Sequence, residues 1–157
     1  VSDLGLTGFQ VSQILNNKYN IQVEMADPYH ILVIVSIGDR RDDLLRLVEA
    51  VREISNDHFR QGPKNLFQEV GFPVFGNQTA LTPREAFFAD TQYVDLEKSV
   101  EAISSEIVTV YPPGVPVLVP GEVISKEAVE YLQKMLKLGA TVDGLDETNT
   151  LIGIVKR

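Results

Sequence analysis

The sequence predicts an α+β fold, because helix-spaced and strand-like apolar patterns follow one another along 157 residues. Residues 125–139 carry apolar side chains every three or four positions, as in an amphipathic helix, whereas residues 31–37 are dense in β-branched side chains. With 44% hydrophobic residues, the chain can bury the core of one ordinary domain or of two small ones.

The chain opens with a helix signal. Thr7 and Gln10 have the spacing of a capping box, and Leu6 and Val11 flank it as a hydrophobic staple. We therefore expect a helix from about Gly8 to Lys18.

Two strands and a second helix are expected next. Apolar and polar residues alternate over 21–25, and residues 31–37 form a more buried strand after the Asp27-Pro28 turn. Asp39 is expected to cap the helix that follows and ends near Ile54. Its apolar residues recur at helical spacing, at Leu44, Leu47, Val48 and Val51.

Periodicity lapses between Ser55 and Pro83, where glycine and proline punctuate the sequence. We expect a boundary or a long connection here. Leu66–Val70 is a candidate short strand inside it.

A second α+β unit is expected after this connection. Asp95 predicts the start of a helix that carries Leu96, Val100 and Ile103. An apolar stretch over 107–111 and a short strand over 115–119, bracketed by prolines, follow.

The clearest helix begins after Ser125 and stops at Gly139. Two closing strands are expected over 140–142 and 151–155, separated by the turn-rich residues 143–149.

Composition excludes several classes of function. The formal net charge is −8 and no cluster of basic residues is present, so nucleic acid is not an expected partner. Zero cysteines exclude disulfides and thiolate chemistry, which fits the cytoplasm. The longest strongly apolar run, 31–35, is too short to cross a membrane. The chain starts at Val1 with a helix signal soon after, and we expect it to be a fragment.

No metal site is expected. His30 and His58 lack the spacing of a metal pair, and structural roles are favoured for both. Asp39, Asp42 and Asp43 precede a helix, whose dipole they complement. Motifs of serine hydrolases, P-loop proteins and dinucleotide-binding folds are missing from the sequence.

The helix and strand patterns described above do not account for two stretches, Thr82–Ala89 and Tyr111–Glu122. The second fixes a strand between proline-containing turns and delivers the carboxylate of Glu122 just beyond its end. Two interpretations of Glu122 are open at this point: a solvent-exposed acid in a turn, or a residue that binds a ligand.

Both stretches closely resemble the C-terminal domain of the bacterial ornithine, lysine and arginine decarboxylase family, which uses pyridoxal phosphate on an aminotransferase-like fold. The resemblance covers Ala80 to Arg157, and the start at Leu4–Gly8 resembles the end of the family's preceding region. It implies that 1–57 is the end of an aminotransferase-like small domain (helix, strand, strand, helix). Residues 58–157 would be the family's C-terminal domain, with a long connection over 58–83.

In that family a lysine, usually after Ser-x-His, forms a Schiff base with pyridoxal phosphate, and an aspartate stabilises the pyridine nitrogen. Neither motif occurs here. The resemblance therefore implies a chain inactive alone, with no catalytic residue of its own and no bound cofactor. Its expected partners are the missing N-terminal cofactor-binding core and a second copy, in a homodimer or another homo-oligomer.

Three site residues are carried over from the resemblance. Glu122 matches the acid of the family's Pro-Gly-Glu motif, implicated in holding the distal cation of a basic amino acid. A carboxylate suits an ammonium or guanidinium group. Tyr111 and Arg84 belong to the matching motifs as further substrate-binding candidates, although packing for Tyr111 and a structural ion pair for Arg84 are the simpler interpretations.

The leading interpretation is thus a fragment of an enzyme of polyamine or acid-resistance metabolism, which removes the carboxyl group of ornithine, lysine or arginine. The alternative is a stand-alone α+β module that binds or senses a small ligand without catalysis. A long upstream coding sequence containing Ser-x-His-Lys would exclude the alternative.

Overall fold

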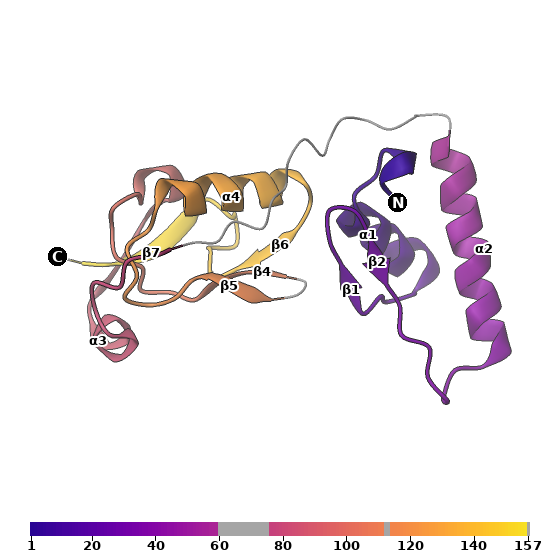
Figure 1. Ribbon diagram of the computed structural model, residues 1–157, viewed down its shortest axis with the longest axis horizontal. Coiled ribbons are helices and arrows are strands. Elements are labelled where there is room, and N and C mark those ends of the chain that lie inside the picture. The colour runs from indigo at the N-terminus through magenta and orange to yellow at the C-terminus, as the bar shows by residue number, and fades with distance from the viewer. Residues whose placement is uncertain (60–75, 112–113, 157) are drawn as a thin grey trace. The chain divides into compact units, whose positions relative to one another are not determined.

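The computed structural model describes residues 1–59, 76–111 and 114–156, which fall into two compact units, Val1–Gly71 and Phe72–Arg157 (Figure 1). Helices and strands occur in both units, which confirms the α+β class. The candidate strand Leu66–Val70 lies outside the described residues. No helix among these residues is long and apolar enough to span a bilayer.

Unit 1 is built on two helices. After the 3-10 helix η1 (Ser2–Leu4), α1 (Gly8–Tyr19) begins with the predicted capping box. The Gln10 amide donates to Thr7 Oγ1 over 3.0 Å, and the Thr7 amide donates to Gln10 Oε1 over 2.9 Å. The core between α1 and α2 (Arg41–His58) is formed by Leu6, Val11, Leu15, Ala50 and Ile54.

The start of α1 lies directly against the turn at 27–30. A Cβ on Gly8 would lie 2.0 Å from the carbonyl oxygen of His30 and 2.3 Å from that of Asp27. The Asp27 carboxylate closes this turn, accepting from the backbone amides of Tyr29 and His30 at 2.6 Å each. Only glycine allows so close an approach of two backbones.

The two predicted strands of unit 1 are much shorter than expected. β1 is Met25–Ala26 and β2 is Ile31–Leu32, paired antiparallel. Burial alternates over 21–25 as predicted. The β-ladder begins only at Met25, so residues 21–24 are not part of a strand. The expectation of a buried strand over 31–37 is wrong, since Ile34 and Val35 are each 61% exposed. The ladder with β1 ends at Leu32, and no described strand pairs with the chain beyond it.

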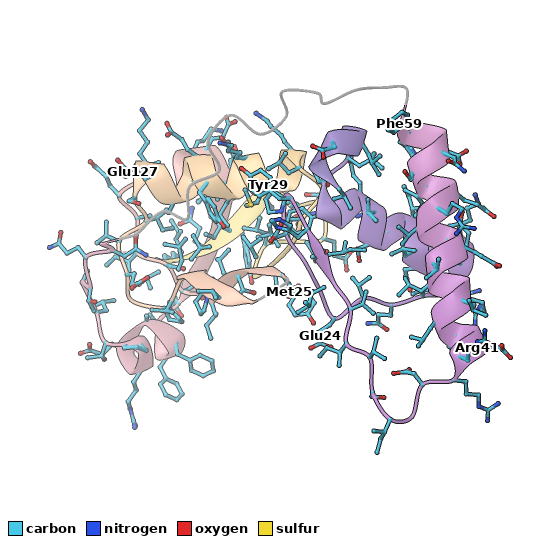
Figure 2. The ribbon with its side chains drawn as sticks, turned by 45° about the vertical axis from the view of Figure 1, so that its right-hand side comes forward. Glu24, Met25, Tyr29, Arg41, Phe59 and Glu127 are labelled. Atoms are coloured by element: carbon cyan, nitrogen blue, oxygen red, sulfur yellow. The ribbon has the colours of Figure 1, made fainter. Side chains whose placement is uncertain are left out.

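Helix α2 differs from its predicted bounds at both ends. Asp39 does not cap it, because its carboxylate accepts from the Ser36 amide and closes the preceding turn. The N-cap is Arg40, whose amide donates to Asp43 Oδ2. The helix continues past Ile54 to His58, and Figure 2 shows it running between the labelled residues Arg41 and Phe59.

The three-stranded sheet of unit 2 has β4 (Val108–Tyr111) between β5 (Val115–Leu118) and β6 (Thr141–Asp143), all antiparallel. These strands lie within a residue of their predicted positions. Pro116 lies in β5, at the edge of the sheet, where a residue without an amide hydrogen is tolerated.

A second, two-stranded sheet pairs β3 (Thr91–Asp95) with β7 (Leu151–Val155) over their full lengths. β7 has its predicted bounds, but β3 was not predicted. Its exposed side chains, with only Val94 partly buried, lack the apolar alternation that signals a strand.

Helix α4 (Lys126–Lys137) confirms the clearest prediction of the sequence. The Ala128 amide donates to Ser125 Oγ over 3.1 Å, and the chain leaves the helix through Gly139 with φ of 87°. The helix contacts β6 with a buried face formed by Ala128, Val129, Leu132 and Met135.

The predicted helix after Asp95 is wrong. Only the 3-10 helix η3 (Leu96–Lys98) forms, and the Asp95 carboxylate caps nothing but binds the Lys98 ammonium. Glu101 then adopts a φ of 68° and donates its amide to the Ile124 carbonyl. Residues beyond Glu101 are thereby drawn into pairing with another part of unit 2 instead of continuing a helix.

The loop between β6 and β7 is organised by one carboxylate. Asp146 accepts from the Thr148 hydroxyl and from the amides of Leu151, Thr150 and Thr148. These hydrogen bonds favour the ionised form and lower the pKa of Asp146 from 3.8 to about 2.

We predict an acid-dependent contribution of Asp146 to stability. Since its pKa is lower in the folded chain, its contribution is complete above its ordinary pKa of 3.8 and is lost as pH falls toward about 2. Asp146→Asn should therefore lower the urea midpoint at about pH 6, and the difference from wild type should narrow at about pH 2. Glu147→Gln, at the neighbouring residue, is the control. A difference that stays constant with pH would contradict the assignment.

Candidate functional site

The carboxylate singled out by the sequence follows a tight turn at the end of β5. The Glu122 amide donates to the Val119 carbonyl over 3.2 Å, and Gly121 has a φ of 93°. Proline at the second position and glycine with positive φ at the third are the features of a type II turn. The sequence Val119-Pro120-Gly121-Glu122 therefore fixes where the Glu122 side chain leaves the backbone.

A distant part of unit 2, the 77–82 segment, is bound to this turn by backbone hydrogen bonds. The amides of Ala80 and Leu81 both donate to the Gly121 carbonyl, at 2.9 and 3.1 Å, and the Val123 amide donates to the Gln78 carbonyl at 2.8 Å. A Cβ on Gly121 would lie 2.2 Å from the Leu81 carbonyl oxygen. The turn can bind the segment only because residue 121 has no side chain.

A third segment holds the turn from Ser104. The Gly121 amide donates to the Ser104 carbonyl over 2.8 Å, and the Ser104 amide donates to the Glu122 carbonyl over 2.9 Å. Ser104 itself is fully buried. The backbone of Gly121 and Glu122 is thus fixed by hydrogen bonds to two separate segments of unit 2.

The two oxygens of the partly buried Glu122 carboxylate differ in their surroundings. Oε2 accepts from the Val119 amide over 3.0 Å and from Asn77 Nδ2 over 2.9 Å. Oε1 accepts no hydrogen bond from the residues that the structure describes. One oxygen is therefore fixed by the protein, and the other keeps its capacity to accept from a cation.

Arg84 lies on α3 (Pro83–Phe88), which begins immediately after the 77–82 segment. The helix has a capping box between Thr82 and Glu85, with Pro83 at its first position. Arg84 is exposed, with its guanidinium carbon 5.7 Å from the ring centroid of Phe88. It forms no ion pair with the described residues, so the simpler interpretation of a structural ion pair is not supported within them.

Tyr111 lies away from Glu122 within unit 2. It is the last residue of β4, more than half exposed, next to the hairpin that leads into β5. Val108, at the other end of β4, pairs with Leu118, which precedes the turn of Glu122. Three strand residues, roughly 10 Å, therefore separate Tyr111 from the end of the hairpin that carries Glu122. The structure does not bring these two candidates together.

The described residues contain no cluster of three or more histidine, aspartate or glutamate side chains that could hold a metal ion. His30 instead contacts the Asp27 carboxylate at 3.2 Å, and His58 lies in the last turn of α2. Asp42 and Asp43 lie in the first turn of α2, where carboxylates complement the helix dipole.

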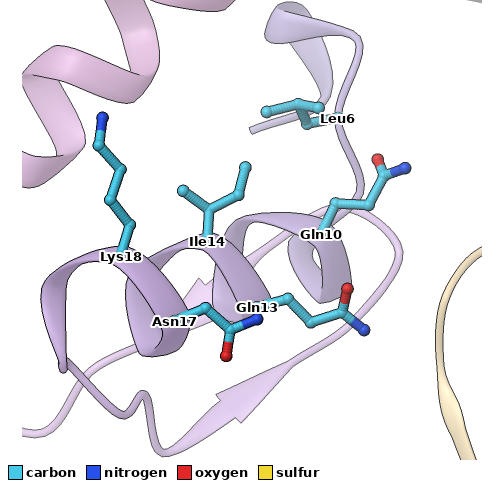
Figure 3. Close-up of a pocket in the computed structure, with 6 residues that line it drawn as sticks. All are labelled: Leu6, Gln10, Gln13, Ile14, Asn17 and Lys18. Carbon is cyan, nitrogen blue, oxygen red and sulfur yellow. The ribbon is translucent and has the colours of Figure 1, made fainter.

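A recess in unit 1 offers no reactive group (Figure 3). Gln10 is part of the capping box, and Lys18 binds the Glu53 carboxylate at 3.5 Å. Hydrogen bonds with Tyr19 and then Glu53 raise the pKa of Lys18, so its amine stays protonated. The recess is lined by Leu6, Gln10, Gln13, Ile14, Asn17 and Lys18.

Three of the described lysines do not suit a Schiff base with pyridoxal phosphate. A lysine that forms a Schiff base must be available as a neutral amine, which requires a lowered pKa. Lys18 has a raised pKa, and Lys98 and Lys126 are exposed and paired with Asp95 and Glu130. None of these three lysines replaces the missing lysine motif.

Comparison with known proteins identifies the family. The model of the Orn/Lys/Arg decarboxylase C-terminal domain matches residues 64–154, more than half of the chain. The chain therefore belongs to the Orn/Lys/Arg decarboxylase family and comprises its C-terminal domain.

Individual relatives agree with this assignment. An arginine decarboxylase of Bacillus subtilis is 41% identical over 99% of this chain and 32% of its own length. The inducible lysine decarboxylase of Escherichia coli is 26% identical over 93% of this chain and 26% of its own length. The chain thus spans about a third or less of the relatives that it matches.

The fold agrees as well. A crystal structure of the lysine decarboxylase of Francisella novicida superimposes with a TM-score of 0.69 at 19% identity, covering 96% of this chain and 28% of that chain. The constitutive lysine decarboxylase of Escherichia coli gives a TM-score of 0.67, also at 19% identity and over 96% and 28%.

Sequence reasoning missed two parts of the site. Helix α3 had a detectable signal, since Thr82 and Glu85 have capping-box spacing around Pro83. Asn77 had none, because Gly76-Asn77 is typical of any turn and its contact with Glu122 joins residues 45 positions apart.

We predict that Gly121→Ala detaches the 77–82 segment from the turn. The added Cβ clashes with the Leu81 carbonyl and strains a backbone with positive φ, at a cost of about 1–3 kcal/mol. Amide hydrogen exchange of Ala80 and Leu81 should accelerate. Gly76→Ala is the matched control, because a Cβ there meets nothing within 4 Å. Unchanged exchange in Gly121→Ala would show that the segment does not depend on this contact.

Proposed function

We propose that this chain is the C-terminal part of a pyridoxal-phosphate-dependent decarboxylase of basic amino acids, in which Glu122 binds the distal cation of the substrate. The observation that carries the proposal is the partly buried Glu122 carboxylate, whose Oε2 is fixed by two N–H donors and whose Oε1 accepts from none of the described residues.

The chemistry of Glu122 suits this role. A cationic head group that binds a carboxylate forms short, charge-assisted hydrogen bonds, stronger than those between neutral groups. Because Oε2 is already fixed, less conformational freedom is lost when Oε1 accepts from the ligand. Amino acids with an uncharged side chain would leave Oε1 of this carboxylate without a cationic partner and would be disfavoured.

Arginine is the substrate we favour among the three basic amino acids. The relatives that are 35–41% identical carry the name arginine decarboxylase, whereas those at 26% are named lysine decarboxylases. A guanidinium presents several N–H donors to a carboxylate.

The rest of the enzyme would supply what this chain lacks. Lys18, Lys98 and Lys126 do not suit a Schiff base and the Ser-x-His-Lys motif does not occur in the sequence, so pyridoxal phosphate would be held by an N-terminal cofactor-binding core of the full-length enzyme. We assign 1–57 to the end of the small domain and 58–157 to the C-terminal domain. We also propose that the full-length enzyme forms a homo-oligomer, is located in the cytoplasm and functions in polyamine metabolism.

Tyr111 and Arg84 are kept as secondary candidates for lining the substrate site. Arg84 is the stronger of the two, since it follows the segment that is bound to the Glu122 turn. Both side chains are exposed within their unit, which leaves them available to another part of the full-length protein.

We predict that Glu122→Gln impairs the full-length enzyme. The glutamine carbonyl can still accept from Asn77 and Val119, so the variant removes the charge and keeps the turn. Loss of a hydrogen bond to a charged group should cost about 1.5–3 kcal/mol, roughly tenfold to a hundredfold in kcat/KM. Steady-state kinetics with arginine, lysine and ornithine measure it.

Glu127→Gln is the control for Glu122→Gln, because Glu127 is an exposed carboxylate on α4 (Figure 2). It should leave kcat/KM unchanged. If Glu122→Gln has the same kcat/KM as the wild type for all three substrates, Glu122 does not bind the substrate and is only a turn residue.

We also predict that the isolated chain releases no carbon dioxide from basic amino acids in the presence of pyridoxal phosphate. It lacks the lysine motif, and Lys18, Lys98 and Lys126 are paired with acidic residues. Carbon dioxide release is measured directly, with the full-length enzyme as the positive control. Turnover by the chain alone would contradict the division of labour proposed above.

A further inference from the structure

Asn77 is the one side chain that joins the 77–82 segment to the carboxylate of Glu122 among the described residues. Its Nδ2 donates to Glu122 Oε2 and to the Val117 carbonyl of β5, each over 2.9 Å. Both amide hydrogens are therefore used, and each goes to a different part of unit 2. The two acceptors, the Val117 carbonyl and Glu122 Oε2, lie before and after Pro120 and Gly121 in the chain.

The orientation of this amide is set by its neighbours. The reverse orientation would place Oδ1 against two acceptors, the Glu122 carboxylate and the Val117 carbonyl, which repel it. In the observed orientation Oδ1 is buried and accepts no hydrogen bond from the described residues. A buried acceptor without a donor is unfavourable, so the two donated hydrogen bonds determine how the side chain lies.

The side chain at position 77 has to supply two N–H donors, one to each of these acceptors. Without them, the Val117 carbonyl would lose this donor, and Glu122 Oε2 would keep only the Val119 amide. A serine has one hydrogen to donate, and an aspartate would add a third acceptor. The backbone of the segment brings the amide into place, since the Val123 amide donates to the carbonyl of the adjacent Gln78.

We propose that Asn77 is a positioning residue of the distal-cation site, which holds Oε2 of Glu122 so that Oε1 alone faces the substrate. This inference rests on the function proposed for Glu122. Asn77 does not touch the substrate. It acts by restricting the rotation of the carboxylate, as neighbouring hydrogen-bond partners do for other binding groups.

The test uses the full-length enzyme with Asn77→Ala and Asn77→Leu, the second keeping the approximate volume of the side chain. Gln78→Ala is the matched control, since it removes an exposed amide side chain one position further along. Each Asn77 variant should raise KM for arginine about threefold to thirtyfold, with a smaller effect on kcat. Gln78→Ala should behave as wild type.

Two further measurements distinguish the proposed positioning role of Asn77 from a purely structural role. Norleucine, a competitive ligand without a distal cation, should keep its inhibition constant in the Asn77 variants, whereas general disruption of the site would weaken it. The double variant Asn77→Ala/Glu122→Gln should be no worse than Glu122→Gln alone, because Asn77 acts through that carboxylate.

The outcomes distinguish this inference from the proposed function. If Glu122→Gln is impaired but the Asn77 variants match wild type, or if the two effects add, the positioning role is overturned and the role of Glu122 stands. If Glu122→Gln itself matches wild type, both are overturned.

Discussion

The contact between the backbones of Gly121 and Leu81 is the constraint on which the candidate site depends. There is no room for a Cβ between them, so at Gly121 the turn and the 77–82 segment meet through main-chain atoms. Backbone N–H and C=O groups are strong hydrogen-bonding groups, and those of the turn are paired with the 77–82 segment and with Ser104. The position of the Glu122 carboxylate follows from this arrangement, with Val119 and Asn77 completing it.

Local signals in the sequence predicted the parts of the fold that depend on neighbouring residues. The capping box at Thr7, the cap at Ser125 and the stop at Gly139 each act within four residues, and all three are present in the structure. The Pro120-Gly121 turn belongs to the same class, because its type follows from the proline and glycine within it. Glu122 is therefore recognisable as a candidate from the sequence alone.

Two of the wrong predictions concern elements whose extent depends on a partner outside the element itself. Residues 31–37 have strand-forming side chains, but a strand ends where its partner ends, and β1 offers only two residues. The helix expected after Asp95 gives way to pairing of the chain near Glu101 with Ile124. Asn77 escaped notice for the same reason, because its partner lies far along the chain.

The two donors to Glu122 Oε2 differ in when they can form as the chain folds. The Val119 amide is three residues away and can reach the carboxylate as soon as the turn closes, whereas the Asn77 amide must close a loop of 45 positions. Closure of a loop that long carries an entropic cost, which is recovered only when the main-chain hydrogen bonds around Gly121 form with it. With the turn alone, Glu122 Oε2 would have one donor, the Val119 amide, and the second donor is added only by the long-range pairing that brings Asn77 to it.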